Sequence, residues 1–126
     1  VSKLLEIATI KKADFREVKN DVRENSFLYF DPPYRPISET ASFTAYSKFS
    51  FEDDEQFQLA SLFIDLDKLG HKLMLSNSDP KNTNPDDNFF DTIYSNFNIS
   101  RVDAKRSINS DPTKRNSIKE IVVTNY

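Results

Sequence analysis

The chain has 126 residues, 37% of them hydrophobic and 29% charged, and this balance is typical of one folded domain. It has no cysteine, which excludes disulfides and thiolate metal sites, and no apolar run approaches the roughly 20 residues of a membrane span. The formal net charge of −3 argues against a uniformly basic nucleic-acid binder, although residues 101–119 carry six Lys or Arg against two Asp.

The first elements of the chain lead to an apolar run that ends at two prolines. Residues 3–10 are compatible with a strand or the end of a helix, and residues 12–18 with a short strand before a polar connection. Residues 26–30 are continuously apolar, which predicts a central parallel strand that is buried on both faces. Pro32 and Pro33 end this strand, because proline lacks the main-chain donor that a strand ladder needs.

A helix is predicted over residues 51–69, after a polar loop over residues 35–50. Ser50 is the expected N-cap, and the acids in the first turn favour the positive end of the helix dipole. Gly70 is placed to close the helix, and an apolar strand follows at residues 72–76, so strand, helix and strand predict a parallel βαβ unit. The apolar helix residues recur at intervals of three and four and predict one buried stripe: Leu59, Leu62, Phe63, Leu66 and Leu69.

The last third of the chain predicts a short helix and a hairpin. Residues 77–87 have the composition of a loop, and residues 88–97 are compatible with a short helix. Residues 98–106 and 117–125 have the pattern of strands, and the turn-rich residues 107–116 join them without a helix. Two strands joined in this way are expected to pair antiparallel.

No metal site is predicted. His71 is the only histidine and has no ligand spacing around it, so we interpret it as structural. Asp79, Asp86 and Asp87 lie in a stretch rich in Pro and Asn, where carboxylates that cap turns are expected and a calcium-type ligand pattern is not seen.

The sequence DPPY at residues 31–34 follows the predicted buried strand directly. An acid at the carboxyl end of a parallel strand lies where open α/β sheets bind ligands. The prolines restrict the backbone, so Asp31 and a main-chain carbonyl can stand at fixed spacing beside the ring of Tyr34. Two such acceptors would activate the exocyclic amine of a base held out of the duplex by stacking. The alternative is an ordinary turn, since Asp and Pro are common turn residues.

DPPY after a hydrophobic strand resembles the catalytic motif of amino-methyltransferases that use S-adenosylmethionine. From residue 12 to 126, three stretches are similar to the DNA adenine methyltransferase family, namely FDPPYRPISETASFTAYSKFSFEDDEQFQLA, LMLSNSD and KRSINSDPTKRNSIKEIVVTNY. The resemblance implies an α/β fold, in which part of a Rossmann-like methyltransferase sheet ends in an antiparallel hairpin. It also implies methyl transfer from S-adenosylmethionine to N6 of a flipped adenine in double-stranded DNA, in a cytoplasmic, bacterial or phage setting such as restriction-modification.

The resemblance also assigns roles to individual residues. Asp31 and the main chain of Pro32 are expected to accept from the adenine amine, with Tyr34 stacked on the base. Asp31 is further expected near the methionine end of the cofactor. The pair of Asp14 and Phe15 resembles the family's acid-aromatic step on the preceding strand, which implies a place at the cofactor's adenine; a core position for Phe15 is the alternative.

Four further residues are expected to contact DNA. Tyr46 is placed at the DNA-facing mouth of the site, and Arg106 and Arg115 flank the terminal hairpin as contacts to phosphate. Asn109 is interpreted either as a backbone contact or as a turn residue. The alternative for Arg106 and Arg115 is an ordinary solvated surface, which is the usual place of charged residues.

The family's glycine-rich cofactor motif, F-x-G-x-G, and the target-recognition region that precedes the catalytic motif do not occur in these residues. We therefore expect residues 1–126 to be the catalytic C-terminal part of a methyltransferase domain, with the missing N-terminal half as its partner. Two alternatives stay open: another amino-methyltransferase that acts on RNA or protein, and a non-catalytic, split or decayed half.

Overall fold

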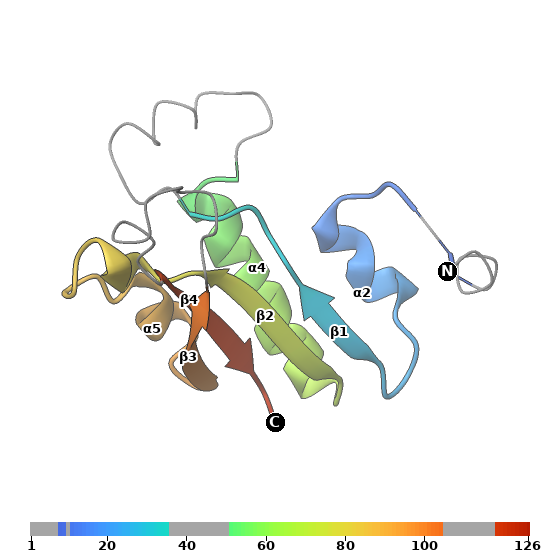
Figure 1. Ribbon diagram of the computed structural model, residues 1–126. Helices are drawn as coiled ribbons and strands as arrows, with labels where there is room; N and C mark the ends of the chain where they lie inside the picture. The colour runs from blue at the N-terminus through green and yellow to red at the C-terminus, as the bar shows by residue number, and fades with distance from the viewer. Residues whose placement is uncertain (1–7, 10, 36–50, 105–117) are drawn as a thin grey trace.

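The computed structural model describes residues 8, 9, 11–35, 51–104 and 118–126, which form a mixed α/β fold around one four-stranded sheet (Figure 1). The strands lie in the order β1-β2-β4-β3, with β1 and β2 parallel and β4 antiparallel to both its neighbours. Their bounds are Phe27–Phe30 for β1, Lys72–Ser78 for β2, Asn98–Ala104 for β3 and Ile118–Thr124 for β4. The predicted βαβ unit and the predicted terminal hairpin are both confirmed.

The long helix α4, Asp53–Lys68, connects β1 to β2. Its N-cap is Glu52, which forms a reciprocal capping box with Glu55, so the prediction of Ser50 as the cap is wrong. At the other end the predicted role of Gly70 is confirmed. Gly70 has a φ of 89°, and the main-chain N–H of His71 reaches back to the Leu66 carbonyl at 3.3 Å. This is a Schellman closure, which requires the left-handed conformation that glycine adopts without strain.

The core lies between α4, the short helix α5 (Phe89–Ile93) and one face of the sheet. The ring of Phe63 in α4 meets Tyr94 at the end of α5 with centroids 5.4 Å apart, so both helices cover the same face. Four residues of the predicted stripe are buried, but Leu69 is 59% exposed, and its assignment to the stripe is wrong. Leu69 is the C-cap residue, where the chain already turns away from the helix. Ala60 of α4 and Phe90 of α5 are also buried in the core. The sheet contributes five further core side chains: Leu28, Leu73, Leu75, Ile121 and Val123.

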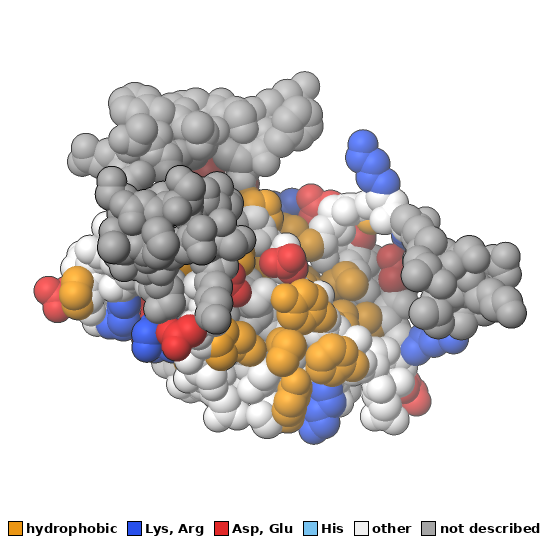
Figure 2. Space-filling view, viewed as in Figure 1, with side chains coloured by type: hydrophobic (Ala, Val, Ile, Leu, Met, Phe, Trp, Pro, Cys, Tyr) orange, Lys and Arg blue, Asp and Glu red, His pale blue; other side chains and the backbone are white. Residues whose placement is uncertain are grey.

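The structure corrects the expectation for β1. Among the described residues β1 is an edge strand that pairs with β2, and of its four residues only Leu28 is buried. Phe27 is 58% and Tyr29 54% exposed on the face opposite α4, and the ring of Tyr126 packs beside Phe27. The view in Figure 2 shows hydrophobic side chains gathered over the strands. The prediction of two buried faces fails because the described helices cover only one.

The prediction for the segment before β1 is also wrong. Residues 12–18 were predicted as a strand, but they contain a 3₁₀ turn, η1 (Phe15–Glu17), that leads into α2 (Val18–Asp21). The carboxylate of Asp14 accepts from the main-chain N–H of Arg16 at 2.9 Å and so caps a helical turn where β pairing was expected. The predictions for residues 3–7, 36–50 and 105–117 lie outside the described residues.

The polar residues after β2 behave as turn formers. Asp79 caps a second 3₁₀ turn, η3 (Pro80–Asn82), and the Asp87 carboxylate accepts from the main-chain N–H of Phe89. His71 is buried, and its Nδ1 accepts from the main-chain N–H of Ser26 at 3.2 Å, which supports a structural role. In the described part of the chain, no three His, Asp or Glu side chains are grouped as metal ligands. None of the helices described is long and apolar enough to cross a membrane.

Candidate functional site

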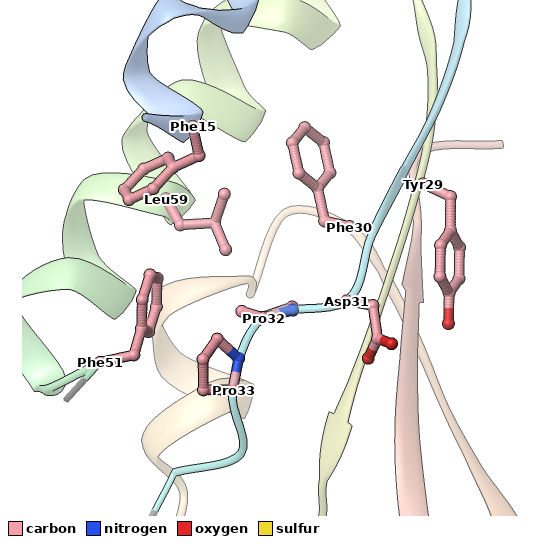
Figure 3. Close-up of a pocket in the computed structure, with 8 residues that line it drawn as sticks. All are labelled: Phe15, Tyr29, Phe30, Asp31, Pro32, Pro33, Phe51 and Leu59. Atoms are coloured by element: carbon pink, nitrogen blue, oxygen red, sulfur yellow. The ribbon is translucent and has the colours of Figure 1, made fainter. Parts of the chain in front are cut away.

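A cavity of about 280 Å³ opens at the carboxyl end of β1, where the DPPY sequence begins. Figure 3 shows Asp31 and Tyr29 pointing to one side of β1 and the Phe30 ring to the other. The cavity therefore combines a carboxylate with an extensive apolar wall. Its lining consists of Phe15, Tyr29, Phe30, Asp31, Pro32, Pro33, Phe51 and Leu59.

The structure separates the predicted pair of Asp14 and Phe15. Phe15 lines the same cavity as Asp31, and its ring lies 5.6 Å from that of Phe51, centroid to centroid. Asp14 does not line the cavity; its carboxylate pairs with the guanidinium of Arg16 at 2.6 Å on the exposed surface. The expected location on a preceding strand is wrong, because both residues lie at the start of η1.

Two fully buried amides hold the main chain of the motif. The Nε2 of Gln56, on α4, donates to the Pro33 carbonyl at 3.4 Å. The Oδ1 of Asn77, near the end of β2, accepts from the main-chain N–H of Arg35 at 3.3 Å and from that of Ser78 at 2.8 Å. Buried polar side chains are costly unless they are bonded, so these contacts fix the path of the motif. Sequence reasoning missed both amides.

Tyr34 has its own anchor on the terminal hairpin. Its side chain is 47% exposed, and its hydroxyl donates to Oε1 of Glu120 on β4 at 2.7 Å. The hydrogen bond to Glu120, with burial and the nearby negative charges, raises the pKa of Tyr34 to about 12. The phenol is neutral at physiological pH, as it already is at the ordinary tyrosine pKa of about 10.

Arg35 links the motif to two further elements. Its guanidinium pairs with Asp53 at the start of α4 at 2.9 Å and with Asp87 before α5 at 3.1 Å. It also lies 4.1 Å from the centroid of the Phe89 ring. Burial alone would lower the pKa of Arg35, but the hydrogen bonds and charges of Asp53 and Asp87 outweigh it and raise that pKa. Sequence reasoning did not assign Arg35 a role.

The structure brings together Asp31, Pro32 and Phe15 at the cavity, whereas Tyr34 does not line it and bonds to Glu120 instead. The expected DNA contacts Tyr46, Arg106, Asn109 and Arg115 lie outside the described residues and stay predictions.

Comparison with known proteins assigns the chain to a family. A family model described as "D12 class N6 adenine-specific DNA methyltransferase" matches residues 1–108. The chain belongs to this family. Its DPPY sequence, which the resemblance singled out, thus lies at a cavity of a D12 class methyltransferase chain.

Individual relatives agree with the D12 class assignment. The chain is 49% identical over 127 residues to "Type II methyltransferase M.MjaIII" of Methanocaldococcus jannaschii, a match that covers 100% of this chain and 42% of the relative. It is 38% identical to "Type II methyltransferase M1.LlaDCHI" of Lactococcus lactis subsp. cremoris, covering 93% and 39%. It is 32% identical to "DNA adenine methylase" of Haemophilus influenzae, covering 86% and 36%. The chain thus spans about two-fifths of the length of these relatives.

Proposed function

We propose that this D12 class chain is the catalytic part of a DNA adenine methyltransferase, which transfers a methyl group from S-adenosylmethionine to N6 of a flipped adenine. The observation that carries the proposal is the position of Asp31, at the carboxyl end of β1 and in a cavity of about 280 Å³. Open α/β sheets bind their ligands at this end of the strands. The description of the matching family and the name of the Haemophilus influenzae relative support the choice of adenine and of DNA.

The residues present suit the proposed cofactor. The aromatic wall around Phe15 and Phe51 suits the flat adenosyl group, and the carboxylate of Asp31 suits the cationic methionine end. When bound, S-adenosylmethionine supplies an activated methyl group on a sulfonium. We propose that Phe15 contacts the cofactor's adenine and that Asp31 lies near its methionine end; Asp14, which is turned to Arg16, is retained only as a weaker candidate.

The chain's own catalytic task is to prepare the amine and hold the base. In the proposal, the carboxylate of Asp31 and the main-chain carbonyl of Pro32 accept from the two N–H bonds of the adenine amine. These acceptors favour the transition state, because positive charge develops on that nitrogen as it bonds to the methyl carbon. The neutral ring of Tyr34 stacks on the base and keeps it out of the duplex. The methyl–sulfur bond would break as the nitrogen–carbon bond forms, and its electron pair would stay on sulfur as an uncharged thioether. The methylated nitrogen would then lose a proton to solvent.

We propose further that residues 1–126 form the C-terminal part of a Rossmann-like methyltransferase domain. The strand order β1-β2-β4-β3, with an antiparallel β4, supports this finer assignment. The polypeptide that carries the glycine-rich cofactor motif and the target-recognition region is proposed to pack on the face of Phe27 and Tyr29. The exposed rings on that face and the edge position of β1 among the described residues support such a partner.

The wider setting is proposed on the same basis. Double-stranded DNA is the proposed substrate, with Tyr46 near the flipped base and Arg106, Asn109 and Arg115 on the backbone. The two relatives named type II methyltransferases support a role in restriction-modification. A cytoplasmic site, where cellular or phage DNA is modified, completes the proposal.

The test is methyl transfer by the full-length polypeptide that carries these 126 residues. Unmethylated DNA and RNA are offered separately with S-adenosylmethionine labelled in the methyl group, and the products are digested to nucleosides. We expect labelled N6-methyladenine from DNA alone, and its loss in Asp31→Ala. Asp86→Ala, which removes an exposed acid that does not line the cavity, is the matched control. Label in RNA would favour the alternative of another amino-methyltransferase, and the absence of any label would favour a non-catalytic half.

A further inference from the structure

Hydrogen bonds hold Tyr34 at its hydroxyl and through the main chain of its two neighbours. Its main chain is held by its neighbours, because Gln56 bonds the Pro33 carbonyl and Asn77 bonds the main-chain N–H of Arg35. The tip of the side chain is held by Glu120, 86 residues away in the sequence. A side chain that is 47% exposed gains little from packing, so its orientation depends on these attachments.

Glu120 lies on the face of the sheet from which it can hold the Tyr34 side chain. On β4 it pairs in register with Ser78 of β2 and Val102 of β3, and this register puts it on the same sheet face as Tyr29. Figure 3 shows that Asp31 points to the side of β1 on which Tyr29 lies. The carboxylate that holds Tyr34 and the carboxylate proposed to accept the adenine amine are therefore on one side of the sheet.

We propose that Glu120 is a positioning residue that fixes the Tyr34 ring in the orientation required to stack on the extruded base. This inference rests on the proposed function. An ionised carboxylate can only accept hydrogen bonds, so the hydroxyl of Tyr34 must donate, and the ring cannot swing away without breaking a charge-assisted bond. The ring is ordered before the base arrives, which removes a cost that binding otherwise bears.

The expected size of the effect follows from that cost. Ordering one free side chain on binding weakens affinity by about two- to ten-fold. Loss of Glu120 should therefore weaken capture of the base without abolishing it, whereas loss of the Tyr34 ring should remove stacking altogether. The raised pKa of Tyr34 gives a separate readout of whether the bond to Glu120 forms in solution.

The experiment measures base capture by the full-length protein with a short duplex in which 2-aminopurine faces an abasic site. An unpaired base is extruded at little cost, so no recognition sequence is needed, and stacking on Tyr34 quenches its fluorescence. Glu120 is replaced by Ala or Gln. Tyr34 is replaced by Phe, which keeps the ring and removes the donor, or by Ala, which removes the ring. The double variant combines Glu120→Ala with Tyr34→Phe. Asp103→Ala removes an exposed acid from the same hairpin and is the matched control for charge.

We expect Glu120→Ala and Tyr34→Phe each to raise the dissociation constant two- to ten-fold, and the double variant to lose no more than either single one. Glu120→Gln, which keeps an acceptor oxygen, should recover part of the loss, and Asp103→Ala should bind as the wild type does. Spectrophotometric titration of the phenols should also show the Tyr34 pKa falling towards 10 in Glu120→Ala.

Two results separate this inference from the proposed function. If Tyr34→Ala loses quenching while Glu120→Ala and Tyr34→Phe bind as tightly as the wild type, or more tightly, the positioning role is overturned and the stacking role stands. If Tyr34→Ala still quenches the probe like the wild type, the stacking role itself fails, and with it the proposed function of Tyr34 and the inference. Independent, additive losses at the two positions would also overturn the inference.

Discussion

Arg35→Ala is expected to loosen the DPPY segment at residues 31–34, because it removes three contacts at once. The guanidinium is only 21% exposed; it pairs with Asp53 and Asp87 and faces the Phe89 ring at 4.1 Å. Its partners are 49% and 28% exposed, so each ion pair contributes only ~0.2–1 kcal/mol after screening. The cation–π contact adds ~0.5–1 kcal/mol. The sum predicts a loss of about 1–3 kcal/mol in the free energy of unfolding.

The assay is urea denaturation of the full-length protein, followed by circular dichroism. With a urea dependence of roughly 1–3 kcal/mol per molar for small proteins, a loss of ~2 kcal/mol lowers the midpoint by roughly 1 M. Arg16→Ala is the matched control, because Arg16 also lies over a ring, Phe15 at 4.9 Å, and pairs with one aspartate. Its side chain is 48% exposed, so we expect a loss below about 1 kcal/mol.

The identity of the lost contacts can be resolved by a double-mutant cycle. The double variant Arg35→Ala/Asp53→Ala should lose less unfolding free energy than the two single variants lose together, since the two side chains contact each other directly. Arg35→Lys should be intermediate, because lysine keeps the charge but cannot bond both carboxylates with a planar fork. The reasoning fails if Arg35→Ala destabilises the protein no more than Arg16→Ala does, or if the cycle shows no coupling.

Three further predictions test the surroundings of the site. Asn77→Ala should cost about 1–3 kcal/mol in unfolding free energy by urea denaturation, because it strips two main-chain N–H groups of their acceptor. Tyr34 should titrate near pH 12 when the phenol is followed by ultraviolet absorbance. Because folding raises the pKa of Tyr34, its protonated hydroxyl contributes fully to the free energy of unfolding below pH 10, and this contribution is lost as the pH rises through 12. Gly70→Ala should cost about 1 kcal/mol by the same denaturation assay, from its φ of 89° and not from a clash, since a Cβ there meets nothing within 4 Å.

The elements that sequence reasoning predicted correctly carry local signals. The apolar period of α4, the glycine after it and the two prolines after β1 each act within a few residues, so the βαβ unit follows from the sequence alone. The errors arise where two local signals compete. Asp14 could lie within a strand or cap a helical turn, and the structure shows the cap. Glu52 takes the N-cap position predicted for Ser50 because it gains a reciprocal bond with Glu55.

Only the site residues that are adjacent in the sequence could be predicted. Asp31, Pro32 and Tyr34 are adjacent and could be recognised as a motif, whereas the contact of Tyr34 with Glu120 spans 86 residues. Long-range partners of this kind leave no periodic signal. A weaker signal did exist for the amides: Gln56 precedes Leu59 by three residues on the buried face of α4, and a polar side chain at such a position needs a specific bond.

The error over β1 is the most informative, because the sequence pattern and the structure disagree on one face of the same strand. A run such as Phe27 to Phe30 is typical of a parallel strand covered on both sides, since an uncovered face is normally polar at every second residue. Here Phe27 and Tyr29 stand on the face opposite α4 with more than half of their surface exposed. Solvation alone does not favour two large rings at neighbouring positions of an edge strand. The composition of β1 therefore favours a protein in which another part of the polypeptide, or a partner chain, covers this face, and this is the ground on which such a partner is proposed above.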